Sequence, residues 1–308
     1  MTASRHTASP ARTVLVTCIY NGLSGTPYGG RLNRDRDYRD SLTTIAGAGV
    51  PMACFVAPDA VPEHRAHFAT HAPNVRLVPM ALQTVPHSDT IQRIKRQHPE
   101  VYRGIEWRER CVQIMWGKLH MLRRTLAGDP SIARVYWIDA GLANVNIVST
   151  RYITPAALEA RRLCEVPRAF PSVLFDRLAV FAGQRVLALA CTRPHNRGVP
   201  ERYNRRPYDT DDALVGGLFG GVRDAVLDLC DRFDAKVDAI LADDTLYFEE
   251  SILTGIRADC PALFQCFTFD SWHHEGWAAH DPRQTNFSQF FDLMLQTPAT
   301  TPAPRFPW

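Results

Sequence analysis

The chain has 308 residues, 45% hydrophobic and 22% charged, which is the composition of a folded globular protein rather than a disordered one. Its 35 basic and 32 acidic side chains give a net charge of +3, too balanced to indicate a nucleic-acid-binding protein. No apolar run reaches the ~18–20 residues that span a bilayer, and the first twelve residues lack the apolar segment of a secretory signal. We therefore expect a cytoplasmic protein.

Short apolar runs alternate with helical spacing through the first half of the chain. Residues 13–20 form a β-branched run that predicts a buried strand. Residues 51–57 and 75–80 predict two more strands, and residues 35–48 and 61–71 have helical spacing. This alternation predicts an α/β fold with an open, mostly parallel, Rossmann-like sheet and helices on both faces.

The second half continues the alternation, with one long amphipathic helix at its start. The expected helices are residues 107–126, 174–182, 222–241 and 245–256. The expected strands are residues 134–142, 186–192 and 263–269, with residues 214–221 as a Gly-rich strand or turn. We expect an arm at residues 1–12, a single catalytic domain at residues 13–295 and a Pro-rich tail at residues 296–308.

An aspartate ends one predicted strand, in the run Tyr136-Trp137-Ile138-Asp139-Ala140-Gly141. Ligands of open α/β sheets bind at the carboxyl ends of the strands. Asp139 is therefore placed where a carboxylate can hold a divalent cation against a diphosphate. An aspartate that caps a turn or a helix is the alternative.

Two adjacent histidines, His273 and His274, follow the last predicted strand between the carboxylates Asp270 and Glu275. Imidazole binds transition metals and transfers protons, so we expect a metal ligand here. Neighbouring side chains of an extended segment point to opposite faces, so only one of the two would face a given metal.

An acidic pair, Glu249 and Glu250, lies in the predicted helix 245–256, for which Asp243 or Asp244 is the expected N-cap. Glu250 would lie about six residues into that helix, flanked by apolar side chains. It is therefore the candidate general base. A solvated helix face is the alternative, and it fits Glu249 better than Glu250.

The loop after the first strand carries candidate donor-binding residues. Thr17 and Asn21 can read a base edge, Tyr20 can stack on a ring, and Arg31 can bind a phosphate. An ordinary polar loop is the alternative.

Four glycines occur within the six residues 216–221, which suggests backbone that lies close to a ligand. Gly217 and Gly220 are the candidate contacts. A bulge or a tight turn is the alternative.

Together these elements resemble a nucleotide-sugar glycosyltransferase of the GT-A type and, more narrowly, the bacterial HtrL/YibB-type glycosyltransferase family. The resemblance covers residues 13–295 and lies in five segments: the strand 13–21, the W-[I/L]-D-x-G character of residues 136–142, the Gly-rich run 216–221, Glu249-Glu250 and Trp272-His273. It implies a GT-A domain of hexosyltransferase type that binds a nucleoside-diphosphate sugar through Mn²⁺ or Mg²⁺.

The resemblance includes one departure from the family pattern. Such enzymes usually hold the metal with a D-x-D motif and often a C-terminal histidine. Asp139 matches the first acid, but Gly141 stands at the position of the second. The implied metal site is therefore Asp139, a histidine from His273-His274, water and the diphosphate, and a cation-independent variant that uses Arg31 is the alternative.

The sugar transfer that the resemblance implies gives each of these acidic residues an expected role. Negative charge develops on the departing diphosphate, and a cation or arginines stabilise it. Glu250, with Glu249 as second choice, would accept the proton of the acceptor hydroxyl if the reaction inverts the anomeric centre. In a retaining reaction the pair would orient the sugar instead.

The expected acceptor is a hydroxyl of a glycan, of a glycolipid or of a lipopolysaccharide core, which would place the protein in the cytoplasm or at the inner membrane face. Five arginines between residues 193 and 206 leave a nucleic-acid or protein acceptor open.

Two other classes compete with this interpretation. A metal-dependent hydrolase or nucleotidyltransferase would use Asp139, His273 and His274 as metal ligands and would turn over without a sugar acceptor. A non-catalytic module that lacks the second metal acid would bind nucleotide weakly and release no sugar.

Overall fold

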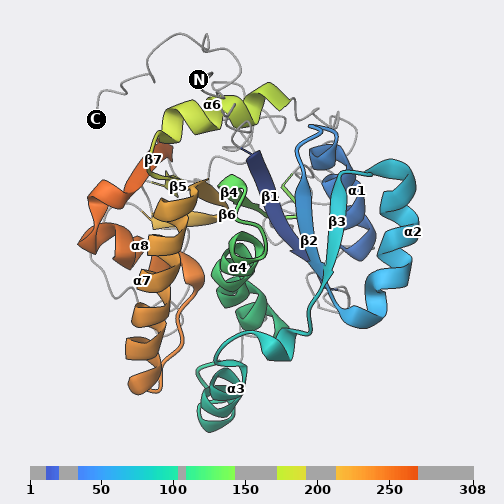
Figure 1. Ribbon diagram of the computed structural model, residues 1–308. Helices are drawn as coiled ribbons and strands as arrows, with labels where there is room; N and C mark the ends of the chain where they lie inside the picture. Colours follow the sequence, from blue (N-terminus) through green and yellow to red (C-terminus); the bar gives the residue numbers. More distant parts are fainter. Residues whose placement is uncertain (1–11, 21–33, 103–108, 143–171, 192–212, 270–308) are drawn as a thin grey trace, which may run out of the picture.

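The computed structural model of the chain describes residues 12–20, 34–102, 109–142, 172–191 and 213–269 (Figure 1). The predicted tail and nearly all of the predicted arm lie outside these residues, so the domain boundaries stay predictions. None of the described helices is long and apolar enough to cross a membrane.

Seven strands form one sheet in the order β3-β2-β1-β4-β6-β5-β7. They are β1 (Arg12–Ile19), β2 (Met52–Val56), β3 (Val75–Pro79), β4 (Ile132–Ile138), β5 (Val186–Cys191), β6 (Ala213–Val222) and β7 (Phe264–Phe269). Four neighbouring pairs are parallel, and β6 runs antiparallel to both β4 and β5. The predicted open, mostly parallel sheet is confirmed.

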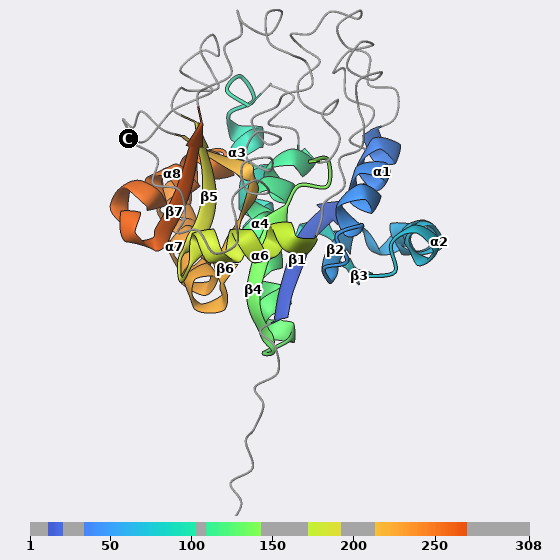
Figure 2. The ribbon, with the colours of Figure 1, turned by 90° about the horizontal axis from the view of Figure 1, so that it is seen from above.

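Helices cover both faces of this sheet (Figures 1 and 2). One layer holds α4 (Glu109–Gly128), α7 (Arg223–Ala242) and α8 (Glu249–Asp259), and the opposite layer holds α1 (Arg34–Ala46), α2 (Val61–His71) and α6 (Ser172–Ala182). Alternate strand residues supply the two cores: Val16 packs in the α4 layer and Leu15 in the α1 layer. The predicted two-sided arrangement is thereby confirmed.

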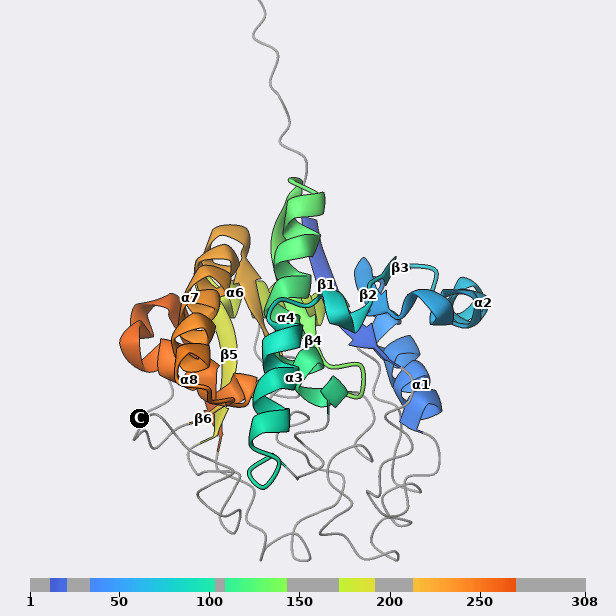
Figure 3. The ribbon, with the colours of Figure 1, turned by 90° about the horizontal axis from the view of Figure 1, so that it is seen from below.

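A further helix, α3 (Ser88–Gln97), packs beside α4 and was not predicted (Figure 3). Its sequence SDTIQRIKRQ has only two apolar residues, Ile91 and Ile94, and both are fully buried. A stripe of two residues is too short for a period to be recognised, although it is enough to dock one short helix.

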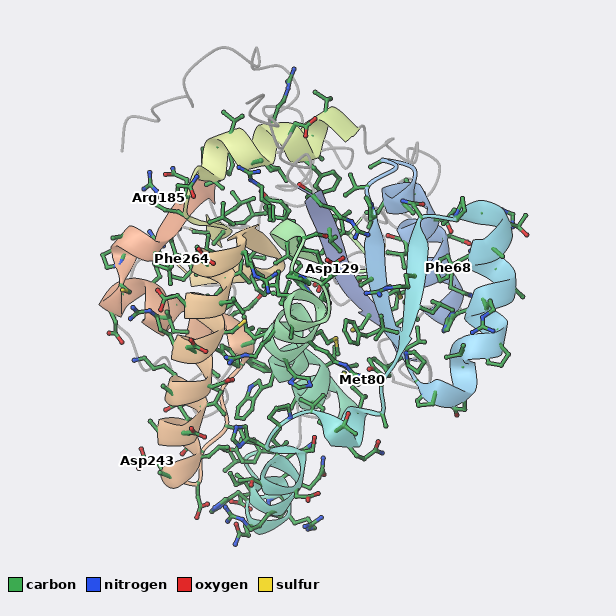
Figure 4. The ribbon with its side chains drawn as sticks, in the orientation of Figure 1. Phe68, Met80, Asp129, Arg185, Asp243 and Phe264 are labelled. Carbon is green, nitrogen blue, oxygen red and sulfur yellow. The ribbon has the colours of Figure 1, made fainter. Side chains whose placement is uncertain are left out.

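The predicted start of the helix at residues 245–256 is wrong. The helix, α8, begins at Glu249 with Phe248 as its N-cap, and no side chain caps it. Asp243 instead lies at the end of α7 (Figure 4), so neither Asp243 nor Asp244 caps α8. Glu250 therefore lies in the first turn rather than about six residues into the helix.

Tertiary hydrogen bonds explain this late start. The indole Nε1 of Trp116 in α4 donates to the carbonyl of Tyr247 at 2.9 Å. The backbone N–H of Leu246 donates to the hydroxyl of Tyr102 at 3.0 Å. The first bond occupies a carbonyl that would accept an intrahelical bond, and the second occupies an N–H that an N-cap side chain would bind, so together they outweigh the capping preference of the two aspartates.

The side chain of Asn74 hydrogen-bonds to the turn between α1 and β2, so replacing Asn74 should destabilise this part of the sheet. Its side-chain amide donates to the carbonyls of Ala46 and Val50 at 2.9 and 2.8 Å. We expect Asn74→Ala to lower the free energy of unfolding by about 1–2 kcal/mol, measured by urea unfolding, because two hydrogen bonds are lost and the Ala46 carbonyl keeps only the Gly49 N–H. Asn74→Asp keeps the shape without the donor and should lose as much; a stable Asp variant would contradict this role.

Candidate functional site

The order of the strands reverses between β1 and β4, which lie side by side and parallel. Such a switch point at the carboxyl ends of strands is where open α/β sheets bind ligands. Val16 of β1 pairs with Trp137 of β4, and Cys18 and Asp139 each lie two residues further along. Burial, together with the nearby Asp139 carboxylate, raises the pKa of the Cys18 thiol to about 12. Asp139 therefore lies at the carboxyl end of a strand, as the sequence predicts, and the structure places it at the switch point beside an un-ionised thiol.

The Gly-rich run forms a bulge in β6 next to this point. Phe219 pairs with Ala188 of β5 and Val215 pairs with Leu189, so residues 216–218 have no counterpart on β5. On the other side, pairing with β4 ends at Leu218. The bulge leaves backbone N–H and C=O groups of β6 for side chains to satisfy, and bulges often accompany functional sites.

Lys118 of α4 reaches this bulge from the helical layer. Its ammonium donates to the carbonyl of Gly216 at 2.9 Å and to Oε1 of Glu249 at 2.7 Å, and it lies 3.2 Å from Oδ1 of Asp139. Burial alone would lower the pKa of Lys118, but the Asp139 and Glu249 carboxylates outweigh it and hold the pKa above its ordinary value. Lys118 is therefore a fixed positive charge beneath the site, and only 7% of its side chain is exposed.

Asp139 is held from two sides and yet remains accessible. Its Oδ1 accepts a hydrogen bond from Nε1 of Trp137 at 2.7 Å, in addition to facing Lys118. Its backbone N–H donates to the carbonyl of Gly217 at 2.9 Å. The side chain is 43% exposed, in contrast to the buried groups beneath it. The side-chain contacts hold the carboxylate through Oδ1, and neither of them involves Oδ2.

The two glutamates of α8 occupy different positions. Glu249 is buried, with 4% of its side chain exposed, and pairs with Lys118, so the solvated helix face is wrong for it. Glu250 is partly buried, and its Oε1 accepts the backbone N–H of Gly216 at 2.8 Å. Burial raises the pKa of Glu249, and Lys118 opposes that rise. Because Glu250 is only partly buried, its carboxyl group is the more accessible of the two.

The pKa of Glu250 predicts how stability should change with pH. Burial raises this pKa above its ordinary value of 4.5, while the Gly216 N–H and Lys118 oppose the rise. The native state therefore holds the proton more tightly than the unfolded chain, and ionisation costs stability as the pH rises from 4.5 through the raised value. Glu250→Gln removes this cost, so its stability relative to the unmodified chain should increase across that window.

Urea unfolding between pH 4 and pH 8 measures this difference, with the exposed Glu100→Gln as the matched control. The control should show no such increase. A difference at Glu250 that decreases with pH would contradict the burial of its carboxyl group.

The remaining predicted donor-binding residues within the described chain are buried in the sheet. Thr17 is fully buried, and its Oγ1 has no hydrogen-bond partner among the described residues. The Tyr20 hydroxyl donates to the carbonyl of Met80 at 3.0 Å, beyond the end of β3. A Cβ at Gly220, which has φ of +150°, would lie 2.2 Å from the carbonyl oxygen of Val135 in β4. The close approach at Gly220 is therefore to a neighbouring strand, and the binding roles of these residues stay predictions.

Four other candidates, Asn21, Arg31, His273 and His274, lie outside the described residues. Within the part of the chain that is described, no three His, Cys, Asp or Glu side chains gather into a metal site. Asp139 does fit the requirement for a single hard oxygen ligand. Mg²⁺ often binds through one or two carboxylates, with substrate phosphates and water as the other ligands. Asp139 can hold such a cation only in company with a phosphorylated substrate or with residues outside the described segments.

Lys118 is the residue of this cluster that the sequence motifs did not single out. Two signals were available: it is one of only three lysines in a chain whose basic residues are otherwise arginine, and the helical period places it on the apolar face of α4. A lysine in an amphipathic helix is ordinarily solvent-exposed, however, and its partner Glu249 lies 131 residues away in the sequence.

No protein-family model and no curated protein matches the chain. Two solved structures resemble it over most of their length. Mouse xyloside xylosyltransferase 1, in its apo form, has a TM-score of 0.45 and 11% identity, and the match covers 93% of this chain and 94% of that one. The 4-diphosphocytidyl-2C-methyl-D-erythritolsynthase from Anaerococcus prevotii DSM 20548 has a TM-score of 0.38 and 11% identity, with 93% and 97% covered. These scores are too low to carry either activity to this chain.

Proposed function

We propose that the chain is a glycosyltransferase that moves a sugar from a nucleoside-diphosphate sugar to an acceptor hydroxyl with the help of Mn²⁺ or Mg²⁺. One observation supports this proposal. The Asp139 carboxylate lies at the switch point of the sheet, is held through one of its oxygens, and is 43% exposed. The sequence resemblance to GT-A enzymes assigns the same residue to the metal. The narrower HtrL/YibB membership and the hexosyltransferase type belong to this proposal.

The charged groups of this site are compatible with a reaction whose leaving group is a diphosphate. A bound cation would neutralise the diphosphate, with Asp139 as its protein ligand. Only through that cation would the Asp139 carboxylate, at the carboxyl end of β4, hold the donor's phosphates. Lys118 keeps a positive charge 3.2 Å from that carboxylate, buried where the local dielectric is low. Glu249 and Asp139 compensate that charge, so the bound cation would be the group that stabilises the negative charge developing as the anomeric bond breaks.

Glu250 is the proposed proton acceptor for an inverting transfer. It is partly buried in the first turn of α8, and Gly216 holds one of its oxygens. Burial raises its pKa, which brings the group closer to the range in which a base both ionises and accepts protons at neutral pH. The acceptor remains a hydroxyl of a glycan, glycolipid or other molecule, and the cytoplasmic or inner-membrane location remains part of the proposal.

A thermal-shift screen tests the proposal. Uridine and guanosine diphosphates and their sugars are added with and without Mn²⁺. One nucleotide family should raise the Tm in a Mn²⁺-dependent manner, because a ligand at a hundredfold excess over Kd adds about 2.7 kcal/mol to the native state. If neither family changes the Tm with or without Mn²⁺, the proposed donor class is wrong. Turnover of a bound donor without any acceptor would favour the competing hydrolase.

A further inference from the structure

We propose that Lys118 is a positioning residue that fixes the orientation of the Asp139 carboxylate, and that Glu249 acts through Lys118 as its counter-charge rather than as a base. The inference deepens the proposed function, on which its binding and activity measurements rest.

Two hydrogen bonds and one ion pair hold the Lys118 ammonium. An ammonium group carries three N–H donors and no acceptor. Three oxygen atoms face it from three different elements: the Gly216 carbonyl of β6, Glu249 of α8 and Asp139 after β4. The side chain is 7% exposed, so bulk water does not compete for these protons. The ammonium is therefore held in one place with one orientation.

That fixed ammonium determines how Asp139 is presented. Both contacts of its carboxylate in the described part of the chain are to Oδ1, from Lys118 and from Nε1 of Trp137. Trp137 is itself buried, and the ammonium lies 5.5 Å from the centre of its ring. A 43% exposed aspartate would otherwise sample several rotamers. The ion pair with Lys118 of α4 and the hydrogen bond from Trp137 of β4 hold the carboxylate through Oδ1 and so restrict its rotamers.

Glu249 has the position of a counter-charge. Its Oε1 binds Lys118, and its Oε2 is buried without a hydrogen-bond partner among the described residues. With 4% of the side chain exposed, an acceptor hydroxyl has no direct approach to it. A buried ammonium needs a compensating anion nearby, and Glu249 supplies the shortest contact at 2.7 Å.

Two simpler roles compete with positioning. Lys118 and Glu249 could serve only to fasten α4 to α8, or Lys118 could contact the substrate directly. The first role predicts that any neutral pair that restores packing also restores function. The second role predicts that the Asp139 carboxylate keeps its orientation when Lys118 is replaced.

The test uses the double variant Lys118→Met with Glu249→Gln. This variant removes both charges, and the new amide can donate to the Gly216 carbonyl, so its Tm should recover most of what Lys118→Met alone loses. The Trp137 indole N–H resonance, assigned with Trp137→Phe, reports on the bond to Asp139. We expect that resonance to move upfield in the double variant. We also expect the affinity for Mn²⁺ with uridine or guanosine diphosphate, whichever raises the wild-type Tm, to fall about 10–100-fold.

A folded double variant with the wild-type indole resonance and affinity would overturn the proposal and leave a structural ion pair. A wild-type resonance with weakened affinity would also overturn it, in favour of direct substrate contact. If wild type binds neither nucleotide, the proposed function is wrong, and the indole shift alone then decides whether Lys118 positions Asp139.

Glu249→Gln alone keeps Lys118 and provides an independent measurement if the double variant fails to fold. With Glu249 as a counter-charge, the acid limb of the pH–rate profile should persist in this variant. Loss of the acid limb would identify Glu249 as the base and overturn its assignment.

Discussion

Replacing Asp139 with asparagine should lower kcat/KM for sugar transfer by about 10²–10³-fold while the fold is retained. The asparagine keeps the shape of the side chain and one carbonyl oxygen, so Nε1 of Trp137 retains an acceptor. It removes the negative charge that would hold a cation at the diphosphate, and losses of one preorganised electrostatic contact in enzymes are of this size. Because the side chain is 43% exposed, the free energy of unfolding should change by about 1 kcal/mol or less.

The measurement pairs steady-state kinetics with a titration of Mn²⁺-dependent nucleotide binding. Asp224→Asn is the matched control: Asp224 is an exposed aspartate in the first turn of α7. It lies at the other end of the sheet, near the pairing of Val222 with Arg134 at the start of β4. Unaltered metal-dependent binding in Asp139→Asn, together with the same result in the control, would remove Asp139 from the site.

The framework of this site could be predicted from the sequence because local patterns determine it. Thr13–Tyr20 and Arg134–Leu142 are apolar runs bounded by turn signals. Most of each forms a strand, and the two strands, β1 and β4, are parallel, with β4 ending at Ile138. Once they are strands, an acid just beyond the second must lie at a carboxyl edge. The position of Asp139 therefore follows from periodicity and topology alone.

The chemistry around Asp139 could not be predicted in the same way, because it depends on long-range contacts. Lys118 meets Glu249 across 131 residues and Gly216 across 98. The helical period places Lys118 on the apolar face of α4, four residues after Ile114 and four before Leu122, but it does not identify the partners of the ammonium. The start of α8 was mispredicted for a related reason, since Trp116 and Tyr102 hold the preceding segment extended against its local capping preference.

The glycines illustrate how one local signal can have different causes. The run 216–221 was compatible with a ligand contact or a bulge, and β6 does contain a bulge at residues 216–218. Gly220 lies against β4, whereas Gly216 lies against the Lys118–Glu249 pair. The absence of a side chain at Gly216 is thus a requirement of the buried ion pair itself, which leads to a strong prediction.

Gly216→Ala should lower the free energy of unfolding by about 3 kcal/mol and weaken Mn²⁺-dependent nucleotide binding at the same time. The new Cβ would lie 2.5 Å from Oε1 of Glu249 and 3.2 Å from Nζ of Lys118. Glu249 has to move, because 2.5 Å is shorter than the contacts that a Cβ can make. Overpacking of a core costs about 1–3 kcal/mol, and separating a buried ion pair costs about 3–5 kcal/mol when one charge loses its partner. A displaced Lys118 would also release Asp139.

Urea unfolding and nucleotide titration of the same samples measure the two effects, with Gly128→Ala as the control. A Cβ at Gly128, the last residue of α4, would meet nothing within 4 Å, so this change should stay within about 1 kcal/mol of wild type. Adding Glu249→Asp to Gly216→Ala shortens the displaced side chain by one methylene and should recover part of the lost stability if the clash is its cause. The prediction fails if Gly216→Ala is as stable as Gly128→Ala, because the Lys118–Glu249 ion pair would then tolerate a Cβ at residue 216.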